Sequence, residues 1–307
     1  MYAYLARRVL STIPVLFGVS LLVFSMLHLV PGDPVKMMLS EFQTNPQQEA
    51  LLRSQLHFDE PLPKQFWRFL SGAVQGDLGY SIRDKRPVST EILEVLPSTI
   101  QLAVAGLLVA LLIGITLGVL AAVKQYSWLD AGSMLVALIG VSMPSFWLGL
   151  LFIFAFSLRL PIFPATGGGG LRHLVLPAVT LGLGASAIIA RLTRSSMLEV
   201  LRREYITTAR AKGLREYRVI VRHGLKNALI PVVTIFGLQF GQLLAGTVVI
   251  ETVFGRPGIG RLIVDAILNK DFPLVQGIVL VVAISYVVVN LIVDLLYAFL
   301  DPRIRYD

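Results

Sequence analysis

The sequence contains no cysteine and little charge. Of its 307 residues, 15% are Asp, Glu, Lys or Arg, whereas 55% are hydrophobic. Without cysteine the chain has no disulfide, no thiolate chemistry and no Cys-ligated metal site, so a redox function of that kind is excluded. So hydrophobic a composition places the chain among membrane proteins.

Patterns that carry enzyme chemistry are missing as well. The four histidines lie on different segments without the spacing of metal ligands, and no Ser-His-Asp or paired-carboxylate arrangement stands out. The segment GGGGLRH, which begins at Gly167, lacks the Lys-Ser/Thr of a phosphate loop, and no Walker A pattern occurs elsewhere. We therefore predict no catalytic residue, no metal site and no ATP hydrolysis on this chain, and we interpret the glycines as a flexible outer loop.

Six apolar runs are long enough to cross a bilayer, because about 20 helical residues span a hydrocarbon core of roughly 30 Å. The fourth run is the shortest. The first could be a signal peptide, but it lacks a small-residue cleavage pattern, so we favour a retained helix. The sequence thus predicts an all-α membrane protein with six transmembrane helices, near residues 9–30, 102–123, 133–157, 174–190, 228–250 and 274–293.

The net charge of +8 can indicate nucleic acid or the basic side of a membrane protein. With the N-terminus inside, the inner segments carry Arg7, Arg8, Lys124, the tail residues Arg303 and Arg305, and ten Lys or Arg between residues 191 and 226. The short outer loops carry fewer. This asymmetry predicts that both termini are cytoplasmic, and it gives no reason to expect a nucleic-acid partner.

The long segment after the first run has two stretches with helical spacing of apolar residues, around Leu51 and Leu52 and around Phe66 and Phe69. We predict a small extracytoplasmic cap of two amphipathic helices; helices that lie flat in the lipid interface are the alternative. Asp33, between two prolines, is expected at the outer mouth, first as a structural turn and second as a docking contact for an external partner.

The charged insert EYITTARAKGLREY (residues 204–217) lies between two apolar runs. Gly213 is suited to end a helix, because glycine adopts left-handed dihedrals without a Cβ penalty. The spacing predicts two short amphipathic helices hinged there, with apolar positions at Leu198, Leu201, Tyr205 and Ala209 and then at Tyr217, Ile220, Val221 and Gly224. Such an insert either lies on anionic lipid or is moved by a separate motor, for which Thr207, Thr208, Ala209 and Ala211 leave room.

The insert, with the RHGLKNALIPVVT that follows, resembles the cytoplasmic loop of ABC-importer permeases of the dipeptide, oligopeptide, nickel and glutathione branch. Other segments match in order: the first 34 residues, GDLGYSI at 76–82, SMPSFWLG at 142–149 and the segment from ETVFGRPGIG at residues 251–277. The family's Glu-Ala-Ala loop pattern matches only at Ala209, Gly213 and Leu225. Glu204, one turn before the pattern's Glu position, can take its place.

The resemblance implies a division into residues 1–30 (cytoplasmic end and first span), 31–98 (cap) and 99–307 (a five-helix core with the coupling loop 191–228). It implies that a coupling helix docks on an ATP-binding subunit through Glu204, Tyr205, Thr207, Thr208, Ala209, Arg210, Lys212 and Gly213. The expected partners are a second, homologous permease, one or two ATP-binding subunits that hold ATP and Mg, and an extracytoplasmic solute-binding protein. No cofactor is expected on this chain.

By the same resemblance, the chain is expected to pass dipeptides or oligopeptides across the cytoplasmic (inner) membrane of a prokaryote; glutathione or a nickel chelate is the alternative cargo. A self-contained secondary transporter would need internal repeats and a charged midplane site, and the sequence has neither. A purely anchoring protein would not need the hinged insert.

Polar residues inside the apolar runs are candidates for the translocation path, because they are costly unless they face a cavity or a partner. Gln239 and Gln242 lie three residues apart and are predicted to share a face, although both can instead bond a neighbouring helix. The weaker candidates are Gln101, Ser142 (beside Pro144, where we expect a kink) and Asn290.

Overall fold

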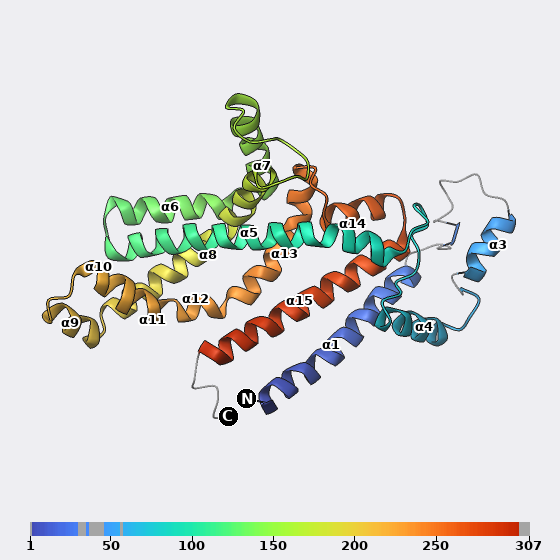
Figure 1. Cartoon of the computed structure of the whole chain (residues 1–307), viewed down its shortest axis with the longest axis horizontal. Helices are drawn as coiled ribbons and strands as arrows, with labels where there is room; N and C mark the ends of the chain where they lie inside the picture. The colour runs from blue at the N-terminus through green and yellow to red at the C-terminus, as the bar shows by residue number, and fades with distance from the viewer. Residues whose placement is uncertain (1, 30–34, 37–45, 56–57, 301–307) are drawn as a thin grey trace. The chain divides into compact units, whose positions relative to one another are not determined.

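The computed structural model describes residues 2–29, 35–36, 46–55 and 58–300. Over these residues the chain is helical, without a β-strand, and it divides into two compact units (Figure 1). One unit contains the described residues up to Pro97 together with Arg261–Leu295, and the other contains Ser98–Gly260.

The first unit contains the predicted cap. Its helices are α1 (Tyr2–Leu29), α3 (Pro46–Gln55), α4 (Leu62–Val74), the start of α5 (Val88–Val123), the end of α14 (Ile259–Leu268) and most of α15 (Phe272–Leu300). The two helices expected in the cap are present as α3 and α4.

Aromatic rings join α4 to α1. The ring of Phe66 lies 5.6 Å from that of Phe17 and 5.5 Å from that of Phe24, both edge-on. His28 and Gln65 are hydrogen-bonded, with 3.2 Å between Nε2 and Oε1. Because one face of α4 is occupied by α1, this helix is packed on protein and not only on lipid.

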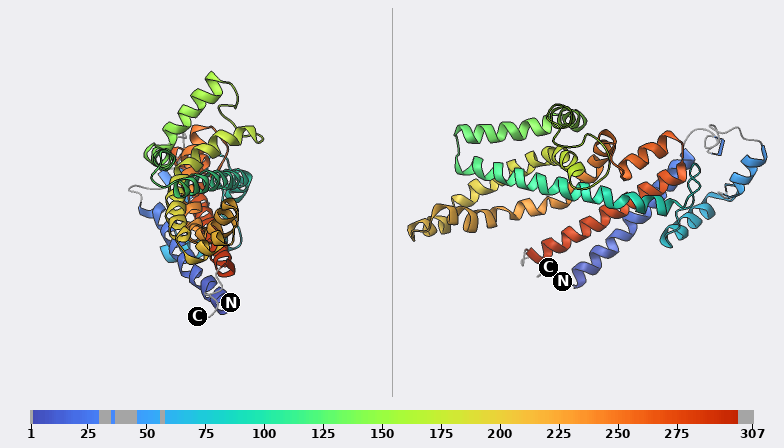
Figure 2. Two further views of the ribbon diagram at one scale, coloured as in Figure 1. Left: turned by 90° about the vertical axis from the view of Figure 1, so that its left-hand side faces the viewer. Right: turned by 45° about the horizontal axis from the view of Figure 1, so that its top comes forward.

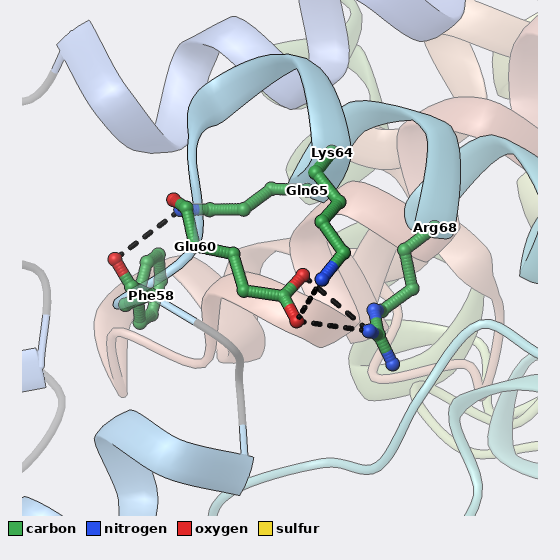
Figure 3. Close-up of polar contacts among 5 residues, drawn as sticks. All are labelled: Phe58, Glu60, Lys64, Gln65 and Arg68. Carbon is green, nitrogen blue, oxygen red and sulfur yellow. Dashed lines mark hydrogen bonds and ion pairs between the residues drawn. The ribbon is translucent and has the colours of Figure 1, made fainter.

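The turn before α4 is held by polar contacts (Figure 3). Gln65 Nε2 donates to the backbone oxygens of Phe58 and Glu60, at 3.3 and 2.7 Å, and the Glu60 carboxylate pairs with Lys64 and Arg68. The ion pairs are exposed and contribute up to about 1 kcal/mol each. The buried amide of Gln65 is therefore the stronger constraint on how the chain enters α4.

The GDLGYSI segment folds onto the start of α15. The buried Asp271 carboxylate accepts hydrogen bonds from Ser81 Oγ at 2.6 Å and from the backbone nitrogens of Ile82 and Arg83 at 3.0 and 3.3 Å. A Cβ on Gly277 would lie 2.4 Å from Val88 Cγ1. Two segments that resemble the importer family are thus one structural unit, although about 190 residues separate them.

The second unit is built around α8 (Arg172–Leu201). The other helices are α6 (Trp128–Ser142), α7 (Ser145–Ile153), the π-helix η1 (Phe154–Arg159), α9 (Glu204–Ala211), α10 (Glu216–Arg218), the π-helix η2 (Val219–Leu225), α11 (Lys226–Ala228), α12 (Ile230–Thr234) and α13 (Phe236–Val253).

Small residues bring α5 and α6 against α8 (Figure 2). A Cβ on Gly114 or Gly118 of α5 would lie 2.7 Å from a backbone oxygen of α8, and one on Gly140 of α6 would lie 2.9 Å from the oxygen of Leu183. Gly106, Ala110, Gly114 and Gly118 recur every four residues, which is the small-xxx-small spacing of closely packed membrane helices. As a result, α8 is the most buried of the candidate membrane helices.

Among the described residues, four helices are long and apolar enough to cross a membrane: Leu10–Leu29, Val88–Val123, Arg172–Leu201 and Phe272–Val293. Two bent pairs bring the number to six, Trp128–Ser142 with Ser145–Arg159 and Glu216–Thr234 with Leu238–Val253. The prediction of an all-α membrane protein is confirmed.

Three predicted spans differ from the structure in shape or length. The run at 228–250 falls in a helix pair that bends by 59° between Thr234 and Leu238. The run at 133–157 turns by 103° at Met143 and Pro144, because the residue before a proline avoids helical dihedrals; Met143 is extended, with ψ at 132°. The kink predicted at Pro144 is therefore a sharp bend. The helix of the fourth span, predicted to end at residue 190, continues to Leu201, and Arg194 within it is paired with Asp130 of α6 at 2.7 Å.

We predict that Gly118→Leu lowers the free energy of unfolding by about 1–3 kcal/mol, because the new side chain would meet the α8 backbone. The measurement is the thermal midpoint of the detergent-solubilised protein. Gly132→Leu on α6 is the matched control, since nothing lies within 4 Å of a Cβ there. An unchanged midpoint for Gly118→Leu would contradict the packing described here.

Candidate coupling site

A compact knob, residues 204–228, follows the end of α8. Arg202 and Arg203 form the turn into α9. Ile206 and Ala209 of α9 are buried against Val219, with Leu201 and Leu214 packed alongside. The knob therefore has its own small apolar core.

Gly213 ends α9 as predicted. Its φ is +75°, and its nitrogen donates to the oxygen of Arg210 at 2.9 Å. The predicted apolar stripe is wrong in two respects. Tyr217 and Val221 of its second half are exposed. Its first half is divided between two helices, since α8 ends at Leu201 and α9 begins at Glu204. Tyr205 is consequently exposed, and Ile206 takes the buried position.

Two polar links close the knob. Arg210 makes a bidentate ion pair with Glu216, at 2.7 Å (Nη2 to Oε1) and 3.2 Å (Nε to Oε2). Glu216 raises the pKa of the Arg210 guanidinium through this hydrogen bond and its charge. Asn227 Nδ2 donates to Tyr205 Oη at 3.0 Å, which joins α9 to α11. α9 is thus held at both ends by the chain itself.

The predicted docking residues are all on this knob, but they do not all face outward. The exposed ones are Glu204, Tyr205, Thr207, Thr208, Arg210, Lys212 and Gly213. Ala209 is buried, and its methyl group belongs to the core of the knob. Ile206, Glu216 and Asn227 were missed. The spacing of Ile206 and Ala209 before Gly213 was a signal for the inner face.

A pocket of about 450 Å³ adjoins α9 at the end of α8. It is lined by Arg194, Ser195, Leu198, Glu199, Arg202 and Arg203. Glu199 pairs with Arg203 and Arg194 pairs with Asp130, so the positive charge of the pocket comes mainly from Arg202. It suits an acidic group better than an apolar one.

The candidate path residues have separate environments. Gln239 is buried whereas Gln242, three residues further along α13, is exposed. Gln101 accepts a hydrogen bond from Arg256 Nη2 at 2.8 Å, Ser142 is exposed before the bend, and Asn290 donates to the oxygen of Tyr286 at 3.0 Å. Their role in translocation stays a prediction. Asp33 lies outside the described residues.

A buried carboxylate that the sequence reasoning missed caps α14. Glu251 accepts from Thr99 Oγ1 at 2.6 Å and from the nitrogen of Gly260 at 2.7 Å, while Thr99 Oγ1 accepts from the nitrogen of Ile259 at 2.8 Å. A Cβ on Gly258 would lie 2.2 Å from Glu251 Oε1. The glycines of the PGIG sequence therefore leave room for the backbone turn to pack directly against this carboxylate.

The turn between α13 and α14 also holds Arg256 and the glycine loop. Burial lowers the pKa of the Arg256 guanidinium, and the charge of Glu251 opposes that shift. Gly167 donates its N–H to the oxygen of Phe254 at 2.9 Å, and a Cβ on Gly168 would lie 2.5 Å from Pro257. The loop that we interpreted as flexible is thus anchored at these two points. Among the described residues, no group of three or more His, Asp or Glu could hold a metal ion.

A helical membrane core with bent spans and a self-contained knob after a long central helix fits a membrane permease. Family models agree: "Binding-protein-dependent transport system inner membrane component" matches residues 114–306, and the N-terminal model of the same systems matches residues 1–103. The chain therefore belongs to this family of ABC-importer permeases, multi-pass proteins of the inner membrane that act with ATP-binding and solute-binding partners.

The chain is 44% identical over 306 residues to the glutathione transport system permease protein GsiC of Escherichia coli strain K12, with 100% of both chains covered. It resembles the MetNI methionine ABC transporter with a TM-score of 0.59 at 18% identity, over 68% of this chain and 96% of that one. An amino acid ABC transporter gives 0.53 at 12% identity, over 68% and 94%. The two structures support the fold alone. The predicted branch of the family is confirmed.

We predict that Gly213→Ala destabilises the knob by about 1–2 kcal/mol, because a non-glycine residue is strained at this φ although no atom lies within 4 Å of the Cβ. The check is the rate of proteolytic cleavage within residues 204–228. Gly213→Asn is the control, since asparagine tolerates left-handed dihedrals better. Equal cleavage of the wild type and Gly213→Ala would contradict the prediction.

Proposed function

We propose that this chain is a pore-forming subunit of an ATP-driven importer, and that α9 is the helix through which separate ATP-binding subunits move it. The observation that carries the proposal is the orientation of α9. Its apolar residues Ile206 and Ala209 face the core of the knob, and its exposed face is polar. A helix that lies on lipid needs an apolar face to insert, and α9 has none left, so docking on protein is favoured over lipid binding.

The packing around α8 allows a movement of α9 to be passed to the membrane helices. α9 follows α8 after only two residues, and α8 is held against α5 and α6 by backbone contacts. A displacement of α9 is therefore passed to three helices together. ATP, with Mg, binds to the partner subunits; their closure draws two coupling helices together and changes which side of the pore is open. Binding at the motor shifts this equilibrium only through contacts that differ between the two states.

The remaining arrangement follows from charge and family. Ten Lys or Arg between residues 191 and 226 favour a cytoplasmic knob, with both termini on the same side. The cap helices α3 and α4 would then face a solute-binding protein, with Asp33 near its contact. A second, homologous permease subunit completes the pore, since coupling helices act in pairs.

For the cargo we propose short peptides, with glutathione the first to test. The support is the name of relatives that are 44% identical over their whole length, and glutathione is itself a modified tripeptide. Dipeptides, longer peptides and nickel chelates stay as alternatives, because the solute-binding protein is the first to select the ligand.

We predict that Thr207→Trp reduces both ATP-dependent uptake and co-purification of the ATP-binding subunit about tenfold or more, the equivalent of about 1.4 kcal/mol of docking energy. Thr207 is exposed on α9, so the new ring blocks an approaching partner without filling the knob's core. Thr207→Ser is the matched control. Ala209 is a poorer site for this test, since a larger residue there disturbs the knob itself. Unimpaired uptake and co-purification in Thr207→Trp would refute docking through α9.

We also expect proteoliposomes that contain the assembled importer and its solute-binding protein to transport labelled glutathione only when ATP is supplied on the side of the membrane that carries the ATP-binding subunits. Unlabelled dipeptides and glutathione serve as competitors. If neither compound is transported or competes while the ATP-binding subunit still co-purifies, the cargo is wrong and the coupling role stands.

A further inference from the structure

The turn between α5 and α6 presents two aromatic side chains outward. Tyr126 is 90% exposed and Trp128 is 93% exposed. Tyr126 also has a φ of +60°, which is strained for a bulky aromatic residue. Strain of this kind persists only where the surrounding structure enforces it, and it often marks a functional segment.

The strained turn is enforced by one buried carboxylate. Asp130, 6% exposed, accepts the N–H of Tyr126 at 3.1 Å through Oδ2. The same carboxylate receives both Nε and Nη2 of Arg194, each at 2.7 Å. Ser127 Oγ caps α6 by accepting the N–H of Asp130. The position of the aromatic residues is thereby fixed relative to α8.

The face of α6 that bears Trp128 continues as exposed apolar surface. Gly132, Leu135 and Ile139 follow Trp128 at helical spacing; Leu135 is 57% and Ile139 is 47% exposed. α6 belongs to a candidate membrane span, and this apolar face is suited to contact with hydrocarbon. Trp and Tyr at the end of such a face are characteristic of the headgroup level of a bilayer.

We infer that the turn at residues 124–129 is a membrane anchor, with Tyr126 and Trp128 in the lipid headgroup region on the side of the knob. The anchor sets the depth of the whole second unit, because Asp130 and Arg194 connect it to α8. Beyond Arg194, α8 continues to Leu201 and adds about 10 Å at about 1.5 Å per residue. α9 then lies in water, clear of the headgroups. The turn and α9 are at the same end of this unit (Figure 1).

The test uses tryptophan fluorescence of the full chain, reconstituted with its partner subunits. The sequence has three tryptophans, so Trp67→Phe with Trp147→Phe leaves Trp128 as the only tryptophan of this chain. The signal of the same assembly with all three changed to Phe, which comes from the partner subunits, is subtracted. The matched control removes all three by changes to Phe and adds Tyr217→Trp, a position on the knob that is 78% exposed. Quenchers are lipids brominated near the headgroup, lipids brominated deep in the chain, and aqueous iodide.

We expect Trp128 to be quenched most by the shallow bromines, less by the deep ones and little by iodide, whereas the Tyr217→Trp probe responds to iodide and not to bromolipid. Equal access of iodide to both probes would place the turn in water and overturn the inference. Protection of Trp128 from every quencher in the assembly, with bromolipid quenching of the chain alone, would identify another subunit as the occupant and overturn it as well.

Discussion

Close approach of helix backbones around α8 is the constraint on which the second unit depends. Gly114 and Gly118 on α5 and Gly140 on α6 stand where a Cβ would meet backbone oxygen of α8. Lipid is as apolar as a leucine side chain, so burial of apolar surface does little to hold membrane helices together. Close contact and dispersion must supply the stability instead, and they require these positions to be small.

The same packing fixes the end of α8 from which the knob extends. α9 is folded around Ile206 and Ala209, closed by the Arg210–Glu216 pair, and joined to α8 by a turn of two residues. Asp130 and Arg194 fasten α6 to α8 just before that turn. The short helix α9 is thus joined, through the turn at Arg202 and Arg203, to three helices that are packed together.

Two buried carboxylates account for motifs that had no evident chemistry. Asp271 gathers the backbone of the GDLGYSI segment onto α15, and Glu251 gathers Thr99 and the PGIG turn onto the start of α14. A buried carboxylate left without donors is costly, so these segments must keep their acids, hydroxyls and glycines together. The GDLGYSI and PGIG motifs therefore stabilise the fold through these carboxylates, whatever part they also have in transport.

Composition and periodicity were sufficient for the all-α membrane class, the cap helices, the stop at Gly213 and the bend at Pro144, because each depends on hydrophobicity or on local backbone preference. They were insufficient for the end of α8, because the charge of Arg191 suggested that the span ends at residue 190, whereas the helix continues to Leu201 and pairs Arg194 with Asp130. They also placed Ala209 on the docking face, although its side chain is buried in the core of the knob. Which side of a short helix is covered, and which charge has a partner, depends on residues far away in the chain, and only the tertiary structure decides that.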